Sequence, residues 1–253
     1  MTSILTNNGA MVALQTLQSV NNSLDQTQSQ ISTGKEVGSA KDNSAVWAIS
    51  KSMESDIGAY ESVTDSLNFG EATVAVASAG MEQIVETLKD MRELAVSGMS
   101  ENVDHAKIEA DLVEKRATIE SIIDSASFNG ANLLDNAVTA SLNVMGGLNE
   151  TADIITITAV DSATDLDTSS LTALTNANAA TVISEIEAML SNAIDSAADL
   201  GAASNRLEDQ GEFIGKLTDA MKSGVSAMTD TNMEEASARL KALQTQQQLA
   251  VQS

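Results

Sequence analysis

The chain of 253 residues contains no cysteine, no proline and a single histidine. Without cysteine there can be no disulfide bond and no thiolate metal site, and one histidine cannot form the ligand clusters that zinc requires. Proline breaks helix interiors, so its absence leaves long uninterrupted helices possible. Only 2% of the residues are aromatic, so a core must be built from aliphatic side chains, alanine and methionine. These absences argue against a globular enzyme and favour a mainly α protein.

Basic residues are also scarce. The 13 lysines and arginines face 36 acidic residues, which gives a net charge of -23. A chain of this charge repels phosphate backbones and anionic lipid, so we expect no nucleic-acid partner and no membrane partner. No run of about 18 apolar residues occurs, and the first residues lack the basic and apolar regions of a cleaved secretory signal. If the protein leaves the cell, it needs a machine that does not read such a signal.

Two sets of apolar residues at heptad spacing predict two long helices that pack together. A helix over residues 53–95 would span about 65 Å, whereas a compact globule of this chain length measures about 45 Å across. We therefore expect an elongated antiparallel helical bundle. Its predicted core consists of Met53, Tyr60, Leu67, Val74, Met81, Leu88 and Ala95 on the first helix, and Ile186, Ala193, Leu200, Leu207, Ile214, Met221 and Met228 on the second.

Both ends of the chain predict thin amphipathic helical arms. Their apolar stripes are too narrow to form a core alone, and short isolated helices are marginal in water. The arms therefore need partners, and we expect them to be the assembly segments of a self-assembling protein. The apolar residues of this prediction are Leu14, Leu17, Leu24 and Ile31 near the start, and Leu240 and Leu243 near the end.

The middle of the chain changes character. Residues 103–126 predict a third helix that folds back on the first, and the Asn-Gly pair in 128–134 predicts a turn. Alternating apolar and polar residues in 140–160 predict a β-hairpin, and residues 161–180 predict a surface loop. The predicted organisation is two helical arms at 1–42 and 229–253, a helical rod at 43–134 and 182–228, and a hairpin-and-loop insert at 135–181.

The sequence gives little support for a catalytic site. His105, the only histidine, is expected to be exposed on a helix, and no G-x-S-x-G motif is present. Asp161, Asp165 and Asp167 lack the glycine and glutamate of a calcium loop and predict a solvated acidic loop. We predict no catalytic residue, no metal, no cofactor and no enzyme activity. Trp47, the only tryptophan, is expected to pack between the first arm and the rod, with a contact to another subunit as the alternative.

Four segments, in order along the chain, resemble bacterial flagellins. These are ISTGKEVGSAKDNSAVWAIS at 31–50, MRELAVSGMS at 91–100, FNGANLL at 128–134 and LGAASNRLE at 200–208. The resemblance implies a structural subunit that self-assembles into the extracellular flagellar filament used for motility. It also implies that the arms form an inner tube, with the rod domain outside it.

The resemblance further implies a set of partners. These are other copies of the chain in a helical homopolymer, the flagellar export apparatus, an export chaperone, and hook-associated and cap proteins. Leu88, Arg92 and Leu94 match a surface that an innate immune receptor recognises in some flagellins, although Asp90 stands where those have arginine. A hook-filament junction protein and a soluble secreted coiled-coil interaction module stay open as alternatives.

The C-terminal arm is shorter than the N-terminal arm and stops where flagellins usually continue into a further apolar helix. We therefore expect that Ser253 is not the natural end of the filament-forming species. The additional segment would cover Ile4, Met11 and Leu14.

Overall fold

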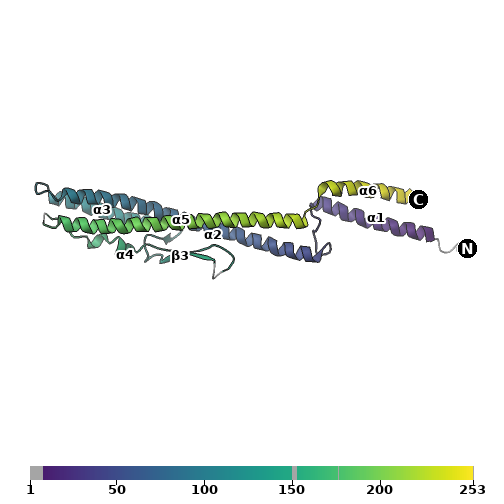
Figure 1. Ribbon diagram of the computed structural model, residues 1–253, viewed down its shortest axis with the longest axis horizontal. Coiled ribbons are helices and arrows are strands. Elements are labelled where there is room, and N and C mark those ends of the chain that lie inside the picture. Colours follow the sequence, from purple (N-terminus) through teal and green to yellow (C-terminus); the bar gives the residue numbers. More distant parts are fainter. Residues whose placement is uncertain (1–7, 150–152, 176, 253) are drawn as a thin grey trace. The chain divides into compact units, whose positions relative to one another are not determined.

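The computed structural model describes residues 8–149, 153–175 and 177–252. The chain divides into two compact units. Unit 1 comprises Met1–Gly58 and Leu217–Ser253, and unit 2 comprises Ala59–Lys216. Most described residues are helical (Figure 1), so the prediction of a mainly α fold is confirmed. The boundaries between units fall inside two long helices, whereas the sequence pattern suggested boundaries near residues 42 and 229.

Unit 1 contains two shorter helices and one end of each long helix. The shorter helices are α1, Asn8–Thr33, and α6, Met233–Gln252. The long helices are α2, Ser44–Ser97, and α5, Ala179–Thr229, each continuous from one unit into the other. Asn43 caps the start of α2, because its Oδ1 accepts a hydrogen bond from Val46 N at 3.2 Å.

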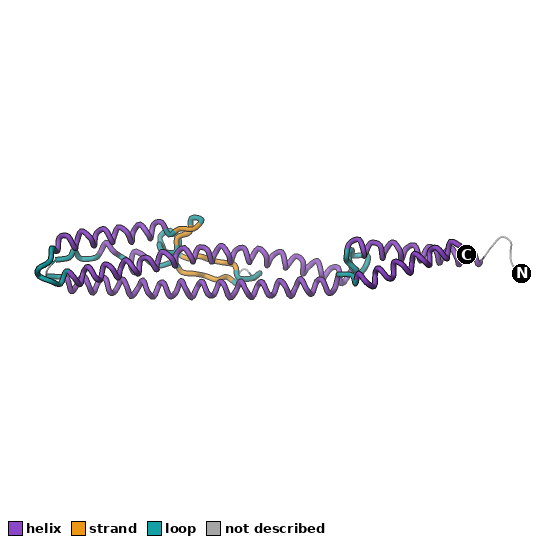
Figure 2. The backbone as a smooth tube through the Cα atoms, turned by 90° about the horizontal axis from the view of Figure 1, so that it is seen from above, coloured by secondary structure: helices purple, strands orange, loops and turns teal. Residues whose placement is uncertain are grey.

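In unit 2, α3 joins α2 and α5 in a bundle (Figure 2). This helix, His105–Ser125, begins at Asp104, whose side chain accepts from Lys107 N. Lys115 Nζ donates to Asp90 Oδ2 at 2.6 Å, which ties α3 to α2. The two residues lie on either side of the turn after Ser97, so α2 and α3 form the predicted antiparallel hairpin.

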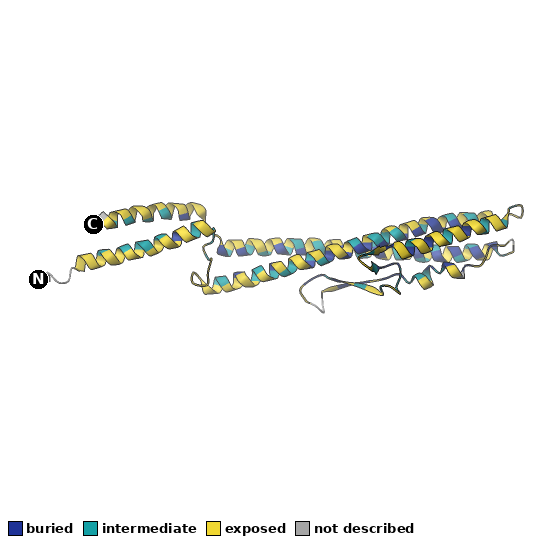
Figure 3. Ribbon diagram, turned by 180° about the vertical axis from the view of Figure 1, so that it is seen from behind, coloured by how far each residue is buried: buried dark blue, intermediate teal, exposed yellow. Residues whose placement is uncertain are grey.

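The heptad residues of unit 2 form its core. The buried members are Leu67, Val74, Met81, Leu88, Ala95, Ile186, Ala193, Leu200, Leu207 and Ile214. Figure 3 shows this buried strip along the facing sides of the helices. Fully burying one such side chain contributes about 1.5–3 kcal/mol to folding, so this seam holds unit 2 together.

Met53, Tyr60, Met221 and Met228 differ from the prediction, because they are only half-buried. Met53 and Met221 belong to unit 1, which lacks α3 and the β-hairpin. A Cβ atom on Gly224 of α5 would lie 3.5 Å from Met53 Cε on α2, so the two helices are adjacent here. Two adjacent helices cover each other on one side only, which leaves the remaining sides of these residues open.

The predicted turn and hairpin are both present. Strands β1, Ser127–Phe128, and β2, Ala131–Asn132, flank Asn129 and Gly130, which have φ of 50° and 84° as the Asn-Gly pair predicts. Strands β3, Ser141–Met145, and β4, Ile154–Thr158, pair in antiparallel register. Their inward-facing residues are buried against the helices: Val144, Ile155 and Ile157.

The predicted surface loop at 161–180 is instead a packed segment. It contains a short helix α4, Ser162–Asp165, and a 3-10 turn η1, Thr168–Ser170. Leu166, Leu171 and Leu174 in this segment are buried in the core of unit 2. Leu174 N donates to Glu109 Oε2 on α3 at 2.7 Å, and Thr172 N donates to Glu185 Oε2 on α5 at 2.9 Å. Polar composition predicted a loop, but three leucines and two carboxylates anchor it to the helices.

Candidate assembly surfaces

The terminal helices α1 and α6 pair with each other inside unit 1 (Figures 1 and 2). Gln247 Nε2 on α6 donates to Asn21 Oδ1 on α1 at 2.7 Å. Among the described side chains of these two helices, only Thr27 and Ala236 are buried. The pair therefore contacts along one polar and aliphatic line without forming a core.

The predicted assembly residues lie at different depths in this pair. Leu14 is 62% exposed, so the partner helix does not cover it. The other predicted members are half-buried: Leu17, Leu24, Ile31, Leu240 and Leu243. Their part in assembly stays a prediction.

More apolar residues than the sequence indicated are exposed toward the ends of α1 and α6 that lie away from the connectors. Each of these residues is at least 60% exposed: Met11, Val12 and Leu14 on α1, and Leu249 and Val251 on α6. The prediction missed Val12, Leu249 and Val251, because none of them lies on the heptad line. Large apolar side chains that a subunit leaves exposed are candidates for protein contact. We call these five residues the arm surface.

The connectors that lead into α2 and out of α5 are joined by a short backbone bridge. Lys35 pairs with Asp230, Glu36 N donates to Thr229 O at 2.7 Å, and Thr231 N donates to Gly34 O at 2.9 Å. Gly34 has φ of 71°, a conformation that costs other residues about 1–2 kcal/mol. We call this bridge the connector clasp. It lies between the end of α1 and the start of α6.

Asp42 organises the turn before α2. Its Oδ2 accepts hydrogen bonds from Ser39 N at 2.9 Å, Ser39 Oγ at 3.0 Å and Gly38 N at 3.2 Å. These bonds, that from Ser39 N first, lower the pKa of the Asp42 carboxyl below its usual value. Trp47, one turn into α2, is half-buried within unit 1.

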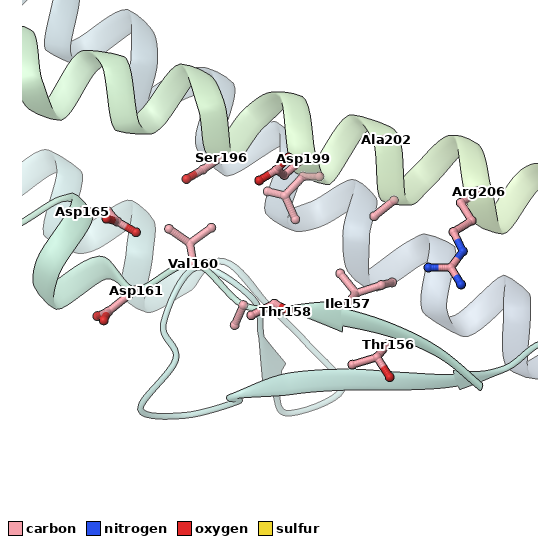
Figure 4. A pocket seen from close by; sticks show the side chains of 13 residues that line it. Thr156, Ile157, Thr158, Val160, Asp161, Asp165, Ser196, Asp199, Ala202 and Arg206 are labelled. Carbon is pink, nitrogen blue, oxygen red and sulfur yellow. The ribbon is translucent and has the colours of Figure 1, made fainter. Parts of the chain in front are cut away.

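Unit 2 carries a cleft of about 470 Å³ between β4 and α5 (Figure 4). Its floor includes the buried residues Ile157 and Val160. Asp161 and Asp165 line one end and Arg206 lines the other, so the cleft has ends of opposite charge. The sequence suggested that the two aspartates belong to a solvated loop, whereas α4 places them at this cleft.

The residues that resemble a receptor surface do not share one surface. Leu88 is 1% exposed and belongs to the core seam, so its assignment to an accessible surface is wrong for this subunit. Arg92 Nε donates to Glu187 Oε1 at 2.8 Å, and Leu94 is half-buried. The assignment of Arg92 and Leu94 stays a prediction.

His105 is half-buried rather than exposed, because its Nε2 donates to Gly98 O at 2.9 Å. It thereby closes the turn between α2 and α3. Among the residues that the structure describes, no group of three or more histidine, cysteine, aspartate or glutamate residues could hold a metal ion. None of the described helices is long and apolar enough to cross a membrane.

Terminal helices that expose apolar residues are typical of structural proteins that assemble with other subunits. Two family descriptions match the chain: the bacterial flagellin N-terminal helical region over residues 4–139, and the bacterial flagellin C-terminal helical region over residues 183–253. The chain therefore belongs to the bacterial flagellin family.

Similarity to individual flagellins extends over the whole chain. A flagellin of Brucella melitensis is 36% identical, with 100% of this chain and 94% of the relative covered. Flagellin C of Rhizobium meliloti is 34% identical, with coverage of 100% and 95%, and flagellin FljM of Caulobacter vibrioides is 36% identical, with coverage of 99% and 93%. These relatives identify a structural subunit of a flagellar filament, as the sequence motifs predicted.

Solved structures share the fold. The crystal structure of Bacillus cereus flagellin has a TM-score of 0.52 at 23% identity, and it covers 58% of this chain and 86% of its own. A putative flagellar hook-associated protein from Vibrio parahaemolyticus has a TM-score of 0.56 at 14% identity, with coverage of 75% and 100%. At such identities the likeness concerns the fold alone.

Proposed function

We propose that the arm surface is the contact through which neighbouring subunits hold one another in the filament. The observation that carries this proposal is the exposure of Met11, Val12 and Leu14 on α1 together with Leu249 and Val251 on α6. Pairing of α1 with α6 leaves these side chains open to solvent, so a single subunit cannot bury them. In this proposal a neighbouring subunit supplies the missing cover, in place of the additional chain segment that the sequence analysis expected over Met11 and Leu14.

The energetic argument follows from apolar burial. Covering one Val, Leu or Met side chain fully contributes about 1.5–3 kcal/mol. Five such side chains per subunit supply several times the thermal energy, even after the ordering of the helix ends is counted. Subunits related by rotation and translation repeat this contact head to tail, and a contact that does not close produces a filament.

The chain acts in this proposal as a structural component without catalysis. Its surroundings follow from the family: an extracellular flagellar filament, reached through the flagellar export apparatus with an export chaperone. Hook-associated and cap proteins would contact the two ends of the filament. Similarity to flagellins along the whole chain supports the growing filament over the hook-filament junction and the soluble coiled-coil module.

Seeded polymerisation of the purified chain tests this function. We expect the wild type to elongate filament fragments, and Leu14→Gln combined with Val12→Gln to reduce the sedimented fraction at least tenfold. Gln18→Ala, on the exposed side of α1, serves as the matched control and should sediment as the wild type does. Circular dichroism melts of the unassembled proteins should coincide, because both apolar residues are exposed in the subunit. Normal elongation by the double variant would contradict the proposal.

A further inference from the structure

Helix α5 carries a second heptad stripe on the side away from its core seam. The members follow the three-four spacing of a coiled-coil seam and are all exposed in the subunit. We call them the outer stripe: Asp199, Ala202, Arg206, Asp209, Phe213 and Lys216. An exposed seam of this kind, with a phenylalanine that is 57% exposed, is suited to contact another helix.

We propose that the outer stripe pairs with the outer stripe of a second copy of the chain, with the two helices antiparallel. Asp199 of each copy then faces Lys216 of the other, and Arg206 of each faces Asp209 of the other. Phe213 packs on Ala202 of the other copy. The two-fold axis passes between Leu207 and Glu208, so each of these contacts occurs twice.

The pattern of charges favours this arrangement over a parallel pair and over antiparallel pairs in a shifted register. In a parallel pair each residue faces its own copy, which places Asp199 on Asp199 and Arg206 on Arg206. Shifting the antiparallel pair by one heptad places Asp199 against Asp209, or Arg206 against Lys216. Like charges in contact oppose binding, and the proposed register alone joins opposite charges at all charged positions.

The charged members are available for such a contact. Within the described part of the chain, no ion pair joins Asp199, Arg206 or Asp209 to another residue. Lys216 Nζ bonds to Glu212 Oε1, one turn earlier on α5, at 2.6 Å, but its side chain remains 74% exposed.

The cleft beside α5 complements this stripe (Figure 4). Asp199, Ala202 and Arg206 form its α5 wall, and Ile157 of β4 lies on its floor. Phe213 of the second copy, seated on Ala202, therefore reaches an apolar recess between two charged ends. Asp199 and Arg206 are seven residues apart, about 10 Å along the helix, and so are Asp209 and Lys216.

This contact closes on itself and does not extend. Neighbouring subunits in a filament built by rotation and translation contact head to tail, whereas the outer stripes meet by a two-fold axis. The pair therefore forms between unassembled subunits, where it holds protein in a form that does not elongate filaments. The inference goes beyond the filament function and does not depend on it.

A charge-exchange experiment tests the pair. Sedimentation velocity of freshly depolymerised full-length protein, at several hundred micromolar and about 0.15 M ionic strength, where general repulsion is screened, should show a monomer-dimer equilibrium. Arg206→Asp alone and Asp209→Arg alone should each weaken dimerisation at least tenfold, because like charges then face each other. An equimolar mixture of these two variants should regain dimers, since each then supplies the charge that the other lacks.

Lys89→Asp and Asp65→Arg on α2 change the net charge equally and should leave dimerisation unchanged. A nitroxide attached through Asp195→Cys should lie about 37 Å from its copy in the antiparallel pair, and much closer in a parallel pair. The proposal is overturned if the wild type remains monomeric, if either single variant dimerises as the wild type does, or if the mixture stays monomeric. A short distance between labels would overturn it as well.

Discussion

Gly70 on α2 lies directly against Val144 on β3. A Cβ atom at Gly70 would come within 2.6 Å of Val144 Cγ2, closer than real carbon atoms approach. Valine is branched at Cβ and cannot swing this methyl group away without turning its whole side chain. The hairpin therefore rests on α2 at this point because position 70 has no side chain.

We expect Gly70→Ala to lower the free energy of unfolding by about 1–3 kcal/mol, since the added methyl overpacks this contact. Gly58→Ala is the matched control, because Gly58 lies in the same helix with no atom within 4 Å of its Cβ position. There the better helix propensity of alanine should raise stability by about 0.5–1 kcal/mol. Chemical denaturation of the unassembled proteins measures both changes. Equal effects of the two substitutions would exclude a close contact at Gly70.

The two seam methionines should respond differently to truncation. Met81 is fully buried in unit 2, so Met81→Ala should cost about 2–5 kcal/mol of stability. Met221 is half-buried, and we expect Met221→Ala to cost distinctly less. Thermal melts of unassembled protein, followed at 222 nm, compare the two. An unchanged melt of the Met81 variant would mean that the seam of unit 2 faces solvent or another subunit.

The turn before α2 should loosen in acid. The hydrogen bonds to Asp42 lower its pKa, so its ionised form stabilises the folded turn above the unfolded pKa of about 4. This contribution is lost as the pH falls through the lower pKa of the folded state. NMR titration of the Asp42 carboxyl should show a midpoint below the usual value. Ser39→Ala removes the hydroxyl donor and should move that midpoint upward, and an unmoved midpoint would contradict the assigned cause.

Salt should accelerate filament growth. Subunits of net charge -23 repel one another, and at 0.15 M ionic strength charges more than about 8 Å apart are screened. We therefore expect seeded elongation to be faster at 0.15 M than at roughly 10 mM ionic strength. The opposite order, measured by light scattering, would show that specific ion pairs rather than general repulsion control the subunit contact.

Periodicity predicted the helices well because burial along a long helix repeats. The heptads from Leu67 to Ala95 and from Ile186 to Ile214 lie in the core, and the alternation around Ile155 lies in a β-hairpin. The Asn-Gly pair at 129 and 130 marks a turn because both residues adopt positive φ. In each case a short sequence pattern reflects the backbone geometry of the helix, strand or turn that contains it.

Burial and pairing that depend on residues far away in the sequence could not be predicted from such local patterns. Leu166, Leu171 and Leu174 follow no heptad, and their burial depends on surfaces supplied by α3 and α5. Met221 follows the heptad but belongs to unit 1, which α3 and the β-hairpin do not enter. The connector clasp uses backbone groups, which every sequence carries. The glycine at position 34, which allows the positive φ found there, is its only trace in the sequence.

The connector clasp changes the entropy of closing the chain on itself. Pairing α1 with α6 brings together segments separated by about 200 residues, and loop-closure entropy rises with the logarithm of that separation. Once Lys35 and Asp230 are bridged, only a few residues separate the bridge from either arm helix. The remaining closure cost falls by roughly 3 kcal/mol on this scaling. Lengthening the segment between α3 and α5 should therefore leave the pairing of α1 with α6 unaffected. The clasp already holds the ends of these two helices close together.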